Sequence, residues 1–499
     1  MNIEFGAIEP YHVSQVWEFI LQWYWIPLSI LYLGVISTIL IENRNPSKTV
    51  SWVMVIVFLP VIGLLLYYLF GQKFQKIRKF QRVNQHQADL LDREWKKLEP
   101  EMEQDLETIE AWIGSAHRVF TFLKNERLSS PSLRNQVKLL TNGEQKFPAL
   151  LEAIRNARHS IHMEYYIFEL DQIGLEVLNA LEEKAKIGIK VRLIADSFGS
   201  PDLDKYLSNQ KHSKIEFQPF LPVTFTSLAN SNYRNHRKIA VIDGHIGFVG
   251  GINISDRYIN SPAYENTGFW RDTSVMIEGE AVNMLQVNFW MAWNQTDGEP
   301  FMISREYLCP IPFKYPEQAA VSFTSSDPGS IGPFNMEAIL LAISEAKDTI
   351  QLCTPYYIPS DELSTALQVA AASGVQVELM LPAESDSYFV QHASFSFLKP
   401  LLTRGVKVYL YKKGFMHAKT LCIDQKVAFI GTTNLDIRSF YINFEISAVI
   451  SDLELCTQLS AAFENDKMES DLLTTAIWKS RSRWKRGVDS LCRLLAPLL

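Results

Sequence analysis

The residues best suited to chemistry in this chain lie in two copies of one short pattern. In the first copy, His236, Lys238 and Asp243 follow the spacing His-x-Lys-x4-Asp, and a Gly-rich tail then runs from Gly250 to Asn253. The second copy repeats the same residue types at the same offsets: His417, Lys419, Asp424, Gly431 and Asn434. A phosphodiester suits two imidazoles, because one can attack phosphorus while the other handles the leaving group.

The residues around each histidine suit the binding of a phosphate group. Residues i and i+2 of a strand share one face, so each histidine points the same way as its lysine. We therefore predict that Lys238 and Lys419 hold a phosphate oxyanion. Asn253 and Asn434 could donate further hydrogen bonds to the same oxygens.

The aspartates of the motif belong to the candidate catalytic set, but their position favours another role. Asp243 and Asp424 lie five residues beyond each lysine, where the strand ends. They are better placed to fix the turn than to do chemistry. The glycines at 250–251 and 431 allow the backbone to approach its neighbours closely.

Each histidine also needs a carboxylate to orient it through its other ring nitrogen. The segments that follow the two motifs can be aligned, and this alignment matches Asp272 with Glu445. We predict that Asp272 orients His236 and that Glu445 orients His417. Glu265, in an insertion of the first half, is the alternative to Asp272.

An internal repeat predicts the architecture. Residues 149–196 and 338–381 both read as helix, strand, helix, strand, and a further strand follows each His-x-Lys step. Alternating strands and helices predict an α/β fold with largely buried sheets. We expect two similar halves, 131–318 and 319–499, related by a pseudo-two-fold axis with each motif at their interface. The tyrosine pairs 165–166 and 356–357 are predicted core residues, or else they line a lipid entrance.

The first 72 residues predict a membrane anchor. Residues 23–41 and 49–72 are uncharged stretches of 19 and 24 residues, and each can cross roughly 30 Å of hydrocarbon. We predict a transmembrane hairpin, with a buried hairpin of a soluble domain as the alternative. Residues 73–130 would form a helical linker. The basic residues at 73–82 place the catalytic region in the cytoplasm by the positive-inside rule.

Composition narrows the class of protein further. The net charge of −7 and the pI of about 5.9 disfavour a nucleic-acid partner. Five scattered cysteines form no CxxC motif, so neither a disulfide framework nor a zinc site is expected. The C-terminal tail at 479–493 is basic and amphipathic, which predicts contact with anionic headgroups.

These motifs resemble the paired signature of the phospholipase D superfamily and, more closely, bacterial cardiolipin synthases. The resemblance rests on the run Asn235-His236-Arg237-Lys238 to Gly250-Gly251-Ile252-Asn253, on 269–272, on 431–440 and on the hairpin. Superfamily members often have Ser after the first Gly of the tail. This chain has Gly251 and Thr432 there, so only the second half could use such a hydroxyl on phosphate.

The resemblance implies phosphatidyl transfer between two phosphatidylglycerol molecules, which yields cardiolipin and glycerol at the bacterial plasma membrane. His236 would form a phosphatidyl-histidine and His417 would act as general acid and base, with no metal or cofactor. A phospholipase D hydrolase is the alternative, because the motifs do not separate transfer from hydrolysis. A nuclease is opposed by the hairpin and the acidic charge, and a non-catalytic scaffold by two intact motifs.

Overall fold

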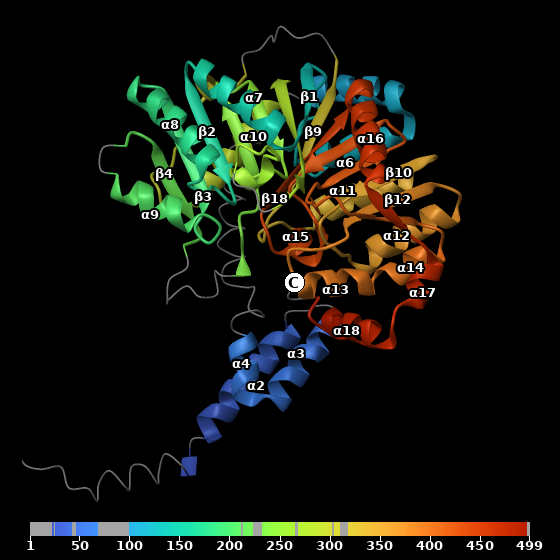
Figure 1. Cartoon of the computed structure of the whole chain (residues 1–499). Coiled ribbons are helices and arrows are strands. Elements are labelled where there is room, and N and C mark those ends of the chain that lie inside the picture. The colour runs from blue at the N-terminus through green and yellow to red at the C-terminus, as the bar shows by residue number, and fades with distance from the viewer. Residues whose placement is uncertain are drawn as a thin grey trace, which may run out of the picture. The chain divides into compact units, whose positions relative to one another are not determined.

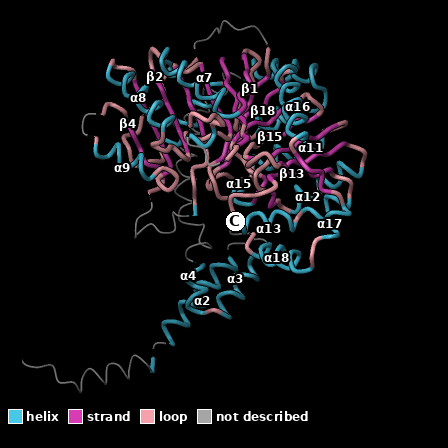
Figure 2. The backbone as a smooth tube through the Cα atoms, viewed as in Figure 1, coloured by secondary structure: helices cyan, strands magenta, loops and turns pink. Residues whose placement is uncertain are grey.

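The computed structural model describes residues 22–23, 25–41, 46–67, 99–210, 213–222, 232–264, 268–301, 304–309 and 318–496. The chain divides into two compact units, Met1–Gln75 and Lys76–Leu499 (Figure 1). Within the larger unit, the strands lie inside and the helices lie around them (Figure 2). The basic segment 73–82 lies outside the described residues.

The described part of the N-terminal unit includes the apolar helices α2 (Trp25–Ile41), α3 (Pro46–Phe58) and α4 (Pro60–Leu66). The second uncharged stretch is therefore not one continuous helix as predicted. It breaks at Leu59, because Pro60 has no N–H to continue the helix and suits the first turn of a new one. Among the described residues, none of the helices combines the length and the apolarity that crossing a membrane requires.

The first half is a seven-stranded mixed sheet in the order β1-β8-β6-β5-β2-β3-β4. Its strands are β1 (Asn135–Thr141), β2 (Ser160–Tyr165), β3 (Lys190–Asp196), β4 (Glu216–Phe220), β5 (Lys238–Ile242), β6 (Ile246–Gly250) and β8 (Thr273–Gly279). Its helices are α7 (Asn142–Asn156), α8 (Gln172–Lys186), α9 (Pro201–Asn209) and α10 (Val282–Trp293). Strand β5, Lys-Ile-Ala-Val-Ile, is buried along its whole length, as a strand covered on both faces requires.

The second half repeats this strand order. Its eight-stranded sheet runs β19-β13-β12-β10-β15-β16-β18-β9, which is the order of the first sheet with β19 added at one edge. The strands are β9 (Ala320–Ser326), β10 (Thr349–Cys353), β12 (Gln376–Pro382), β13 (Lys407–Tyr411), β15 (Thr420–Ile423), β16 (Val427–Gly431), β18 (Glu445–Ser451) and β19 (Ser470–Leu473). The helices are α11 (Phe334–Glu345), α12 (Asp361–Ala372), α13 (Tyr388–Ser396), α14 (Leu398–Thr403), α15 (Ile437–Tyr441), α16 (Leu453–Met468), α17 (Thr475–Ser480) and α18 (Arg483–Leu494).

The two halves share an apolar core. Val241 and Val275 of the first sheet lie in one buried cluster with Phe323, Ile430 and Ile446 of the second. Burial of such side chains contributes roughly 1.5–3 kcal/mol each. This shared core brings the sheet regions that carry the two motifs together.

The helical residues before the first half are more than a linker. Residues 99–113 and α6 (Arg118–Asn125) are helical, and they contribute Ile109, Phe120 and Leu123 to the core of the second half. The segment predicted to join two domains therefore covers a face of one of them.

Asp243 and Asp424 fix turns. Both residues adopt the left-handed conformation, with φ of 52° and 51°. The Asp243 carboxylate accepts hydrogen bonds from the backbone N–H groups of residues 158–160 at 2.7–3.0 Å. Asp424 accepts the equivalent three from residues 347–349 at 2.7–2.8 Å. Their inclusion in the catalytic set is thus corrected: each carboxylate is already occupied by the loop before β2 or β10.

This role predicts a loss of stability without a loss of chemistry. Asp243→Asn should lower the free energy of unfolding by about 1–2 kcal/mol, because the amide NH2 cannot accept from backbone N–H groups. Chemical unfolding in detergent micelles would measure it, with the surface ion-pair residue Asp471 changed to Asn as control. The folded Asp243→Asn protein should keep its kcat; a kcat reduced by orders of magnitude would return Asp243 to the catalytic set.

Candidate active site

Backbone pairing between the two halves positions His236. The residue lies just before β5, and its N–H donates to the Phe444 carbonyl at 3.0 Å, while the Phe444 N–H donates to Arg234 at 2.9 Å. The backbone N–H of the intervening Asn235 donates to the Asp196 carboxylate at the end of β3, at 2.9 Å. The side-chain amide of Asn235 donates to the Glu164 carboxylate of β2, at 2.7 Å. The ends of two buried strands therefore hold the segment that carries His236.

The second histidine is positioned by the same kind of pairing. Strand β14 (Phe415–Met416) of the second half runs parallel to β7 (Trp270–Arg271) of the first. The His417 N–H donates to the Arg271 carbonyl at 2.8 Å. In each case, the partner strand continues directly into a carboxylate residue of the other half.

The histidine–carboxylate pairs consequently cross between the halves. His236 Nδ1 lies 3.0 Å from Glu445 Oε2, and His417 Nδ1 lies 2.6 Å from Asp272 Oδ2. The predicted pairing within each half, Asp272 with His236 and Glu445 with His417, is therefore wrong. The two carboxylates themselves were correctly matched to each other. Glu265, the alternative, lies outside the described residues.

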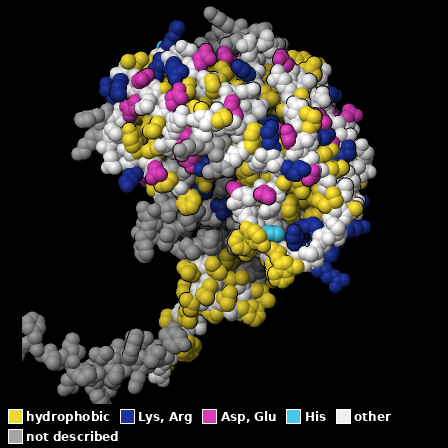
Figure 3. All heavy atoms as spheres, viewed as in Figure 1, with side chains coloured by type: hydrophobic (Ala, Val, Ile, Leu, Met, Phe, Trp, Pro, Cys, Tyr) yellow, Lys and Arg dark blue, Asp and Glu magenta, His cyan; other side chains and the backbone are white. Residues whose placement is uncertain are grey.

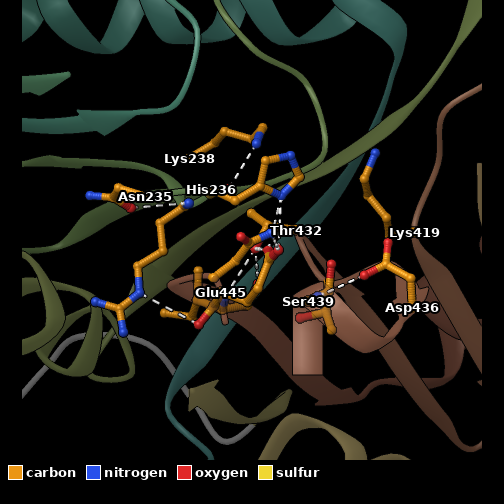
Figure 4. A network of polar contacts seen from close by, with 12 residues as sticks. Asn235, His236, Lys238, Lys419, Thr432, Asp436, Ser439 and Glu445 are labelled. Carbon is orange, nitrogen blue, oxygen red and sulfur yellow. Dashed lines mark hydrogen bonds and ion pairs between the residues drawn. The ribbon is translucent and has the colours of Figure 1, made fainter. Parts of the chain in front are cut away.

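Glu445 is held by neighbours that keep it in place for His236 (Figure 4). The Thr432 hydroxyl donates to Glu445 Oε2 at 2.5 Å, and the Asn443 amide donates to Oε1 at 3.2 Å. Thr432 is fully buried, so its hydroxyl serves the carboxylate, and the predicted use of that hydroxyl on phosphate is corrected.

At Asp272, the glycine of the first half explains the departure from Ser. A Cβ on Gly251 would lie 2.2 Å from Asp272 Oδ1, so the carboxylate occupies the space that a side chain would take. The Thr273 N–H donates to the same oxygen at 2.7 Å. The expected close approach at this Gly-rich step is confirmed.

Sequence reasoning missed two residues near Asp272. The Asn142 side chain accepts from the Asp272 N–H at 2.9 Å. Lys146 of α7 is buried and donates to the Ile252 carbonyl at 2.6 Å. Burial lowers the pKa of Lys146 to about 7, although the charge of Asp272 opposes that shift. A lone lysine in an amphipathic helix carries no sequence signal for such a place.

The two lysines and two histidines form one electrostatic system. Lys238 Nζ donates to the His236 carbonyl at 2.7 Å, and Lys419 Nζ to the His417 carbonyl at 2.5 Å. Burial lowers the pKa of Lys419 to about 8 and holds that of Lys238 well below its usual range. Burial, with Lys419, lowers the pKa of His417 to about 3. Burial likewise lowers the pKa of His236, and the positive charge of Lys419 in the other half lowers it further.

The two motif asparagines differ in their contacts. The Asn253 side chain accepts from the Ile167 N–H at 3.2 Å and donates to the Tyr258 hydroxyl at 2.6 Å. Its side chain therefore makes contacts within the fold, and its expected role on phosphate stays a prediction. Asn434 is buried, and its Oδ1 has no hydrogen-bond partner within the described residues.

Aromatic rings surround both histidines. The Tyr166 ring lies 5.0 Å from the ring of His236, and those of Tyr258, Trp270 and Phe415 lie 5.3–5.7 Å from that of His417. Each predicted tyrosine pair divides between the core and the site. Tyr165 and Tyr357 are buried in the core. Tyr166 lies beside His236, and Tyr356 contacts Phe415 with ring centroids 6.4 Å apart. Successive residues of extended backbone point to opposite faces, so alternation could have separated the pairs.

The arrangement can bind and activate a phosphodiester. It presents two imidazoles with buried carboxylate partners and two lysines beside them. In the part of the chain that the structure describes, no group of three or more His, Cys, Asp or Glu side chains could hold a metal ion.

Comparison with known proteins places this chain in a family. Residues 150–293 and 339–467 match the family described as cardiolipin synthase, PLD-like domain, and residues 30–72 match the phospholipase D–nuclease N-terminal family. The crystal structure of phosphatidylserine synthase from Haemophilus influenzae Rd KW20 shares the fold. Its TM-score is 0.58 at 16% identity, over 76% of this chain and 98% of that one.

Curated relatives narrow the class. The cardiolipin synthase of Halalkalibacterium halodurans is 37% identical over 477 residues, which cover 95% of this chain and 93% of the relative. Cardiolipin synthase 2 of Bacillus anthracis is 38% identical over 465 residues, or 92% and 88% of the two chains. This chain belongs to the bacterial cardiolipin synthases, phosphatidyltransferases of the phospholipase D superfamily.

The crossed pairs predict which histidine each carboxylate controls. Glu445→Gln should change the tautomer of His236 and leave that of His417 unchanged, because the carboxylate selects the Nδ1–H form of its own partner. Asp272→Asn should do the reverse. Imidazole ¹⁵N chemical shifts of histidine-labelled protein would report both tautomers. A change at His417 in the Glu445→Gln protein would contradict the crossed arrangement.

The pKa of Lys419 predicts an alkaline limit to activity. A lysine that holds a phosphate must be protonated, so kcat/KM should fall as pH rises through about 8. Lys419→Arg should move this limb to higher pH, even at reduced activity, because a guanidinium stays charged. Lys146→Met is the matched control and should retain the limb. A limb at the same pH in the Lys419→Arg protein would rule out Lys419 as its source.

Proposed function

We propose that this chain transfers a phosphatidyl group from one phosphatidylglycerol to another through a phosphohistidine, giving cardiolipin and glycerol. The observation that carries the proposal is the pair of crossed histidine–carboxylate contacts, each beside a buried lysine. The cardiolipin synthases to which the chain is similar support this choice of substrate and product.

In the first step, His236 is the nucleophile. Glu445 accepts a hydrogen bond from Nδ1–H, which keeps that proton on Nδ1 and leaves the Nε2 lone pair free to attack phosphorus. As the new P–N bond forms, the P–O bond to glycerol breaks and His417 donates a proton to the departing oxygen. Lys238 and Lys419 stabilise the charge on the phosphate oxygens. The bound phosphate also favours the protonated form of His417, against the burial that lowers its pKa.

In the second step, the roles reverse at His417. Its neutral Nε2 accepts the proton of a glycerol hydroxyl on the second phosphatidylglycerol, and that oxygen attacks phosphorus. The P–N bond to His236 breaks and cardiolipin leaves. Proton and electron pair return to their starting positions, so the cycle needs no further reactant.

The same proposal includes the membrane location. The two uncharged stretches within residues 1–72 would form a two-span hairpin in the plasma membrane, with the catalytic region on the cytoplasmic side. The match of residues 30–72 to a phospholipase D–nuclease N-terminal family supports a common N-terminal module. The basic residues that follow support the orientation.

Purified protein incubated with phosphatidylglycerol alone tests the function. The expected products are cardiolipin and glycerol in equal amounts, and His236→Ala and His417→Ala should each lower turnover by about 10³-fold or more. Acid quenching followed by peptide mapping should locate a phosphatidyl adduct on His236.

Three outcomes would contradict parts of this scheme. Phosphatidic acid as the only lipid product would show hydrolysis, with water as the acceptor. An adduct on His417 would exchange the roles of the two histidines. Near-normal turnover in either folded alanine variant would remove the two-histidine mechanism.

A further inference from the structure

The C-terminal helix α18 packs on α13 through an unusual buried contact. The Asp489 carboxylate is 3% exposed, and it lies 2.6 Å from His392 Nδ1 of α13 and 2.7 Å from the Arg481 guanidinium. Val488, Cys492 and Ala496 complete the apolar part of the contact. This face of α18 is therefore fixed against the catalytic unit, which determines the face that points outward.

The outward face carries large apolar side chains. Trp484, Leu491 and Leu494 are 80%, 67% and 75% exposed, and Tyr388 and Phe389 at the start of α13 are 61% and 54% exposed. Positions 484 and 491 are two helical turns apart, so they lie on one side of α18. Tyr388 adjoins the His392–Asp489 contact, with 4.4 Å between the Tyr388 and His392 ring centroids. We call these five side chains and the basic residues beside them the α13–α18 surface.

The charge around these side chains has one sign. From residue 478 to residue 494, Asp489 is the one acidic residue, and it is buried. Five basic residues of this segment are exposed: Lys479, Arg483, Lys485, Arg486 and Arg493. Hydrophobic and basic side chains lie next to one another over α13 and α18 in Figure 3. Exposed aromatic and aliphatic groups flanked by Lys and Arg suit the interface of an anionic bilayer.

The same surface connects to the active site. Asp386, just before α13, accepts a hydrogen bond from the Tyr356 hydroxyl at 2.8–2.9 Å. Ser394 of α13 accepts from the Tyr357 N–H at 3.1 Å. The negative charge of Asp386 also favours the protonated form of Lys419. A bilayer that contacts α13 would therefore lie near Tyr356, whose ring contacts Phe415, two residues before His417.

We propose that the α13–α18 surface docks the catalytic unit onto an anionic phospholipid bilayer, and that this docking presents lipid headgroups to the His417 side of the site. The proposal deepens the proposed function and rests on it for the identity of the lipid. It adds a second membrane contact, independent of the N-terminal stretches.

Lipid quenching of a fluorophore on the full-length protein tests the docking. Cys309, Cys353, Cys422, Cys456 and Cys492 are all buried, so a maleimide dye can be directed to Leu491→Cys. Leu453→Cys is the matched control, because Leu453 is a leucine of the same catalytic unit and 77% exposed. In vesicles of phosphatidylglycerol and phosphatidylcholine with spin-labelled lipid, dye at 491 should be quenched severalfold more than dye at 453. High salt or phosphatidylcholine alone should reduce the difference.

Equal quenching at the two positions would overturn the docking. So would a spectral change at 491 that depends on protein concentration and not on lipid, because it would show a second copy of the chain on this surface. The measurement needs no turnover and can be repeated in the His236→Ala protein. Quenching without cardiolipin formation in the unmodified protein would therefore reject the proposed function while leaving the docking intact.

A kinetic comparison provides the second arm. The triple variant Trp484→Ser, Leu491→Ser and Leu494→Ser should raise the apparent KM for phosphatidylglycerol in vesicles severalfold and leave kcat unchanged. The control variant, Leu453→Ser with Met468→Ser, removes two equally exposed apolar side chains elsewhere and should change neither. An unchanged KM in the triple variant would contradict the proposed presentation of lipid to the site.

Discussion

The site depends on the backbone hydrogen bond from His236 to Phe444 and on its counterpart from His417 to Arg271. Each joins a motif of one half to the strand of the other half that continues into a carboxylate. Because a hydrogen bond of this kind sets the relative position of two chains to within a few tenths of an ångström, it brings each histidine to its carboxylate. Each motif histidine has its carboxylate partner in the other half, and the shared apolar core between the sheets keeps the two halves in register.

Burial gives this arrangement its chemical character. Lys238 and Lys419 are nearly inaccessible, and burial lowers the pKa of both. Burial would raise the pKa of Asp272, but Lys419 and His417 reverse that effect and the pKa is lowered; at Glu445, His236 and Lys238 do the same. Two carboxylates are thus kept ionised among four groups that can carry positive charge. Binding an anionic ligand, such as a phosphodiester, would stabilise the positive charge in such a site.

The two halves reach the same geometry with different side chains. In the first half, the shorter Asp272 lies against Gly251, where no Cβ could fit. In the second half, the longer Glu445 is held by the Thr432 hydroxyl. The glycine and the threonine occupy equivalent positions of the repeated tail, so each is matched to the carboxylate of its own half. Each carboxylate contacts the histidine of the other half. His236 therefore has a glutamate beside it and His417 an aspartate, so the two histidines have unequal surroundings.

The sequence by itself determined which residues are the candidates for chemistry, and it predicted the architecture around them. A pattern that repeats residue types and offsets identifies His236, Lys238, His417 and Lys419, and the repeated alternation of helices and strands specifies two α/β halves. The alignment also matched Asp272 with Glu445, because equivalent residues of a duplicated fold keep equivalent positions along their strands.

Only the tertiary structure decided which groups meet. The parallel pairings of β14 with β7 and of Asn235 with Phe444 join segments more than a hundred residues apart, and no local pattern encodes them. They assign Glu445 to His236 and Asp272 to His417. Periodicity reports which face of a strand is buried, whereas the partner across an interface is set by how two complete sheets pack.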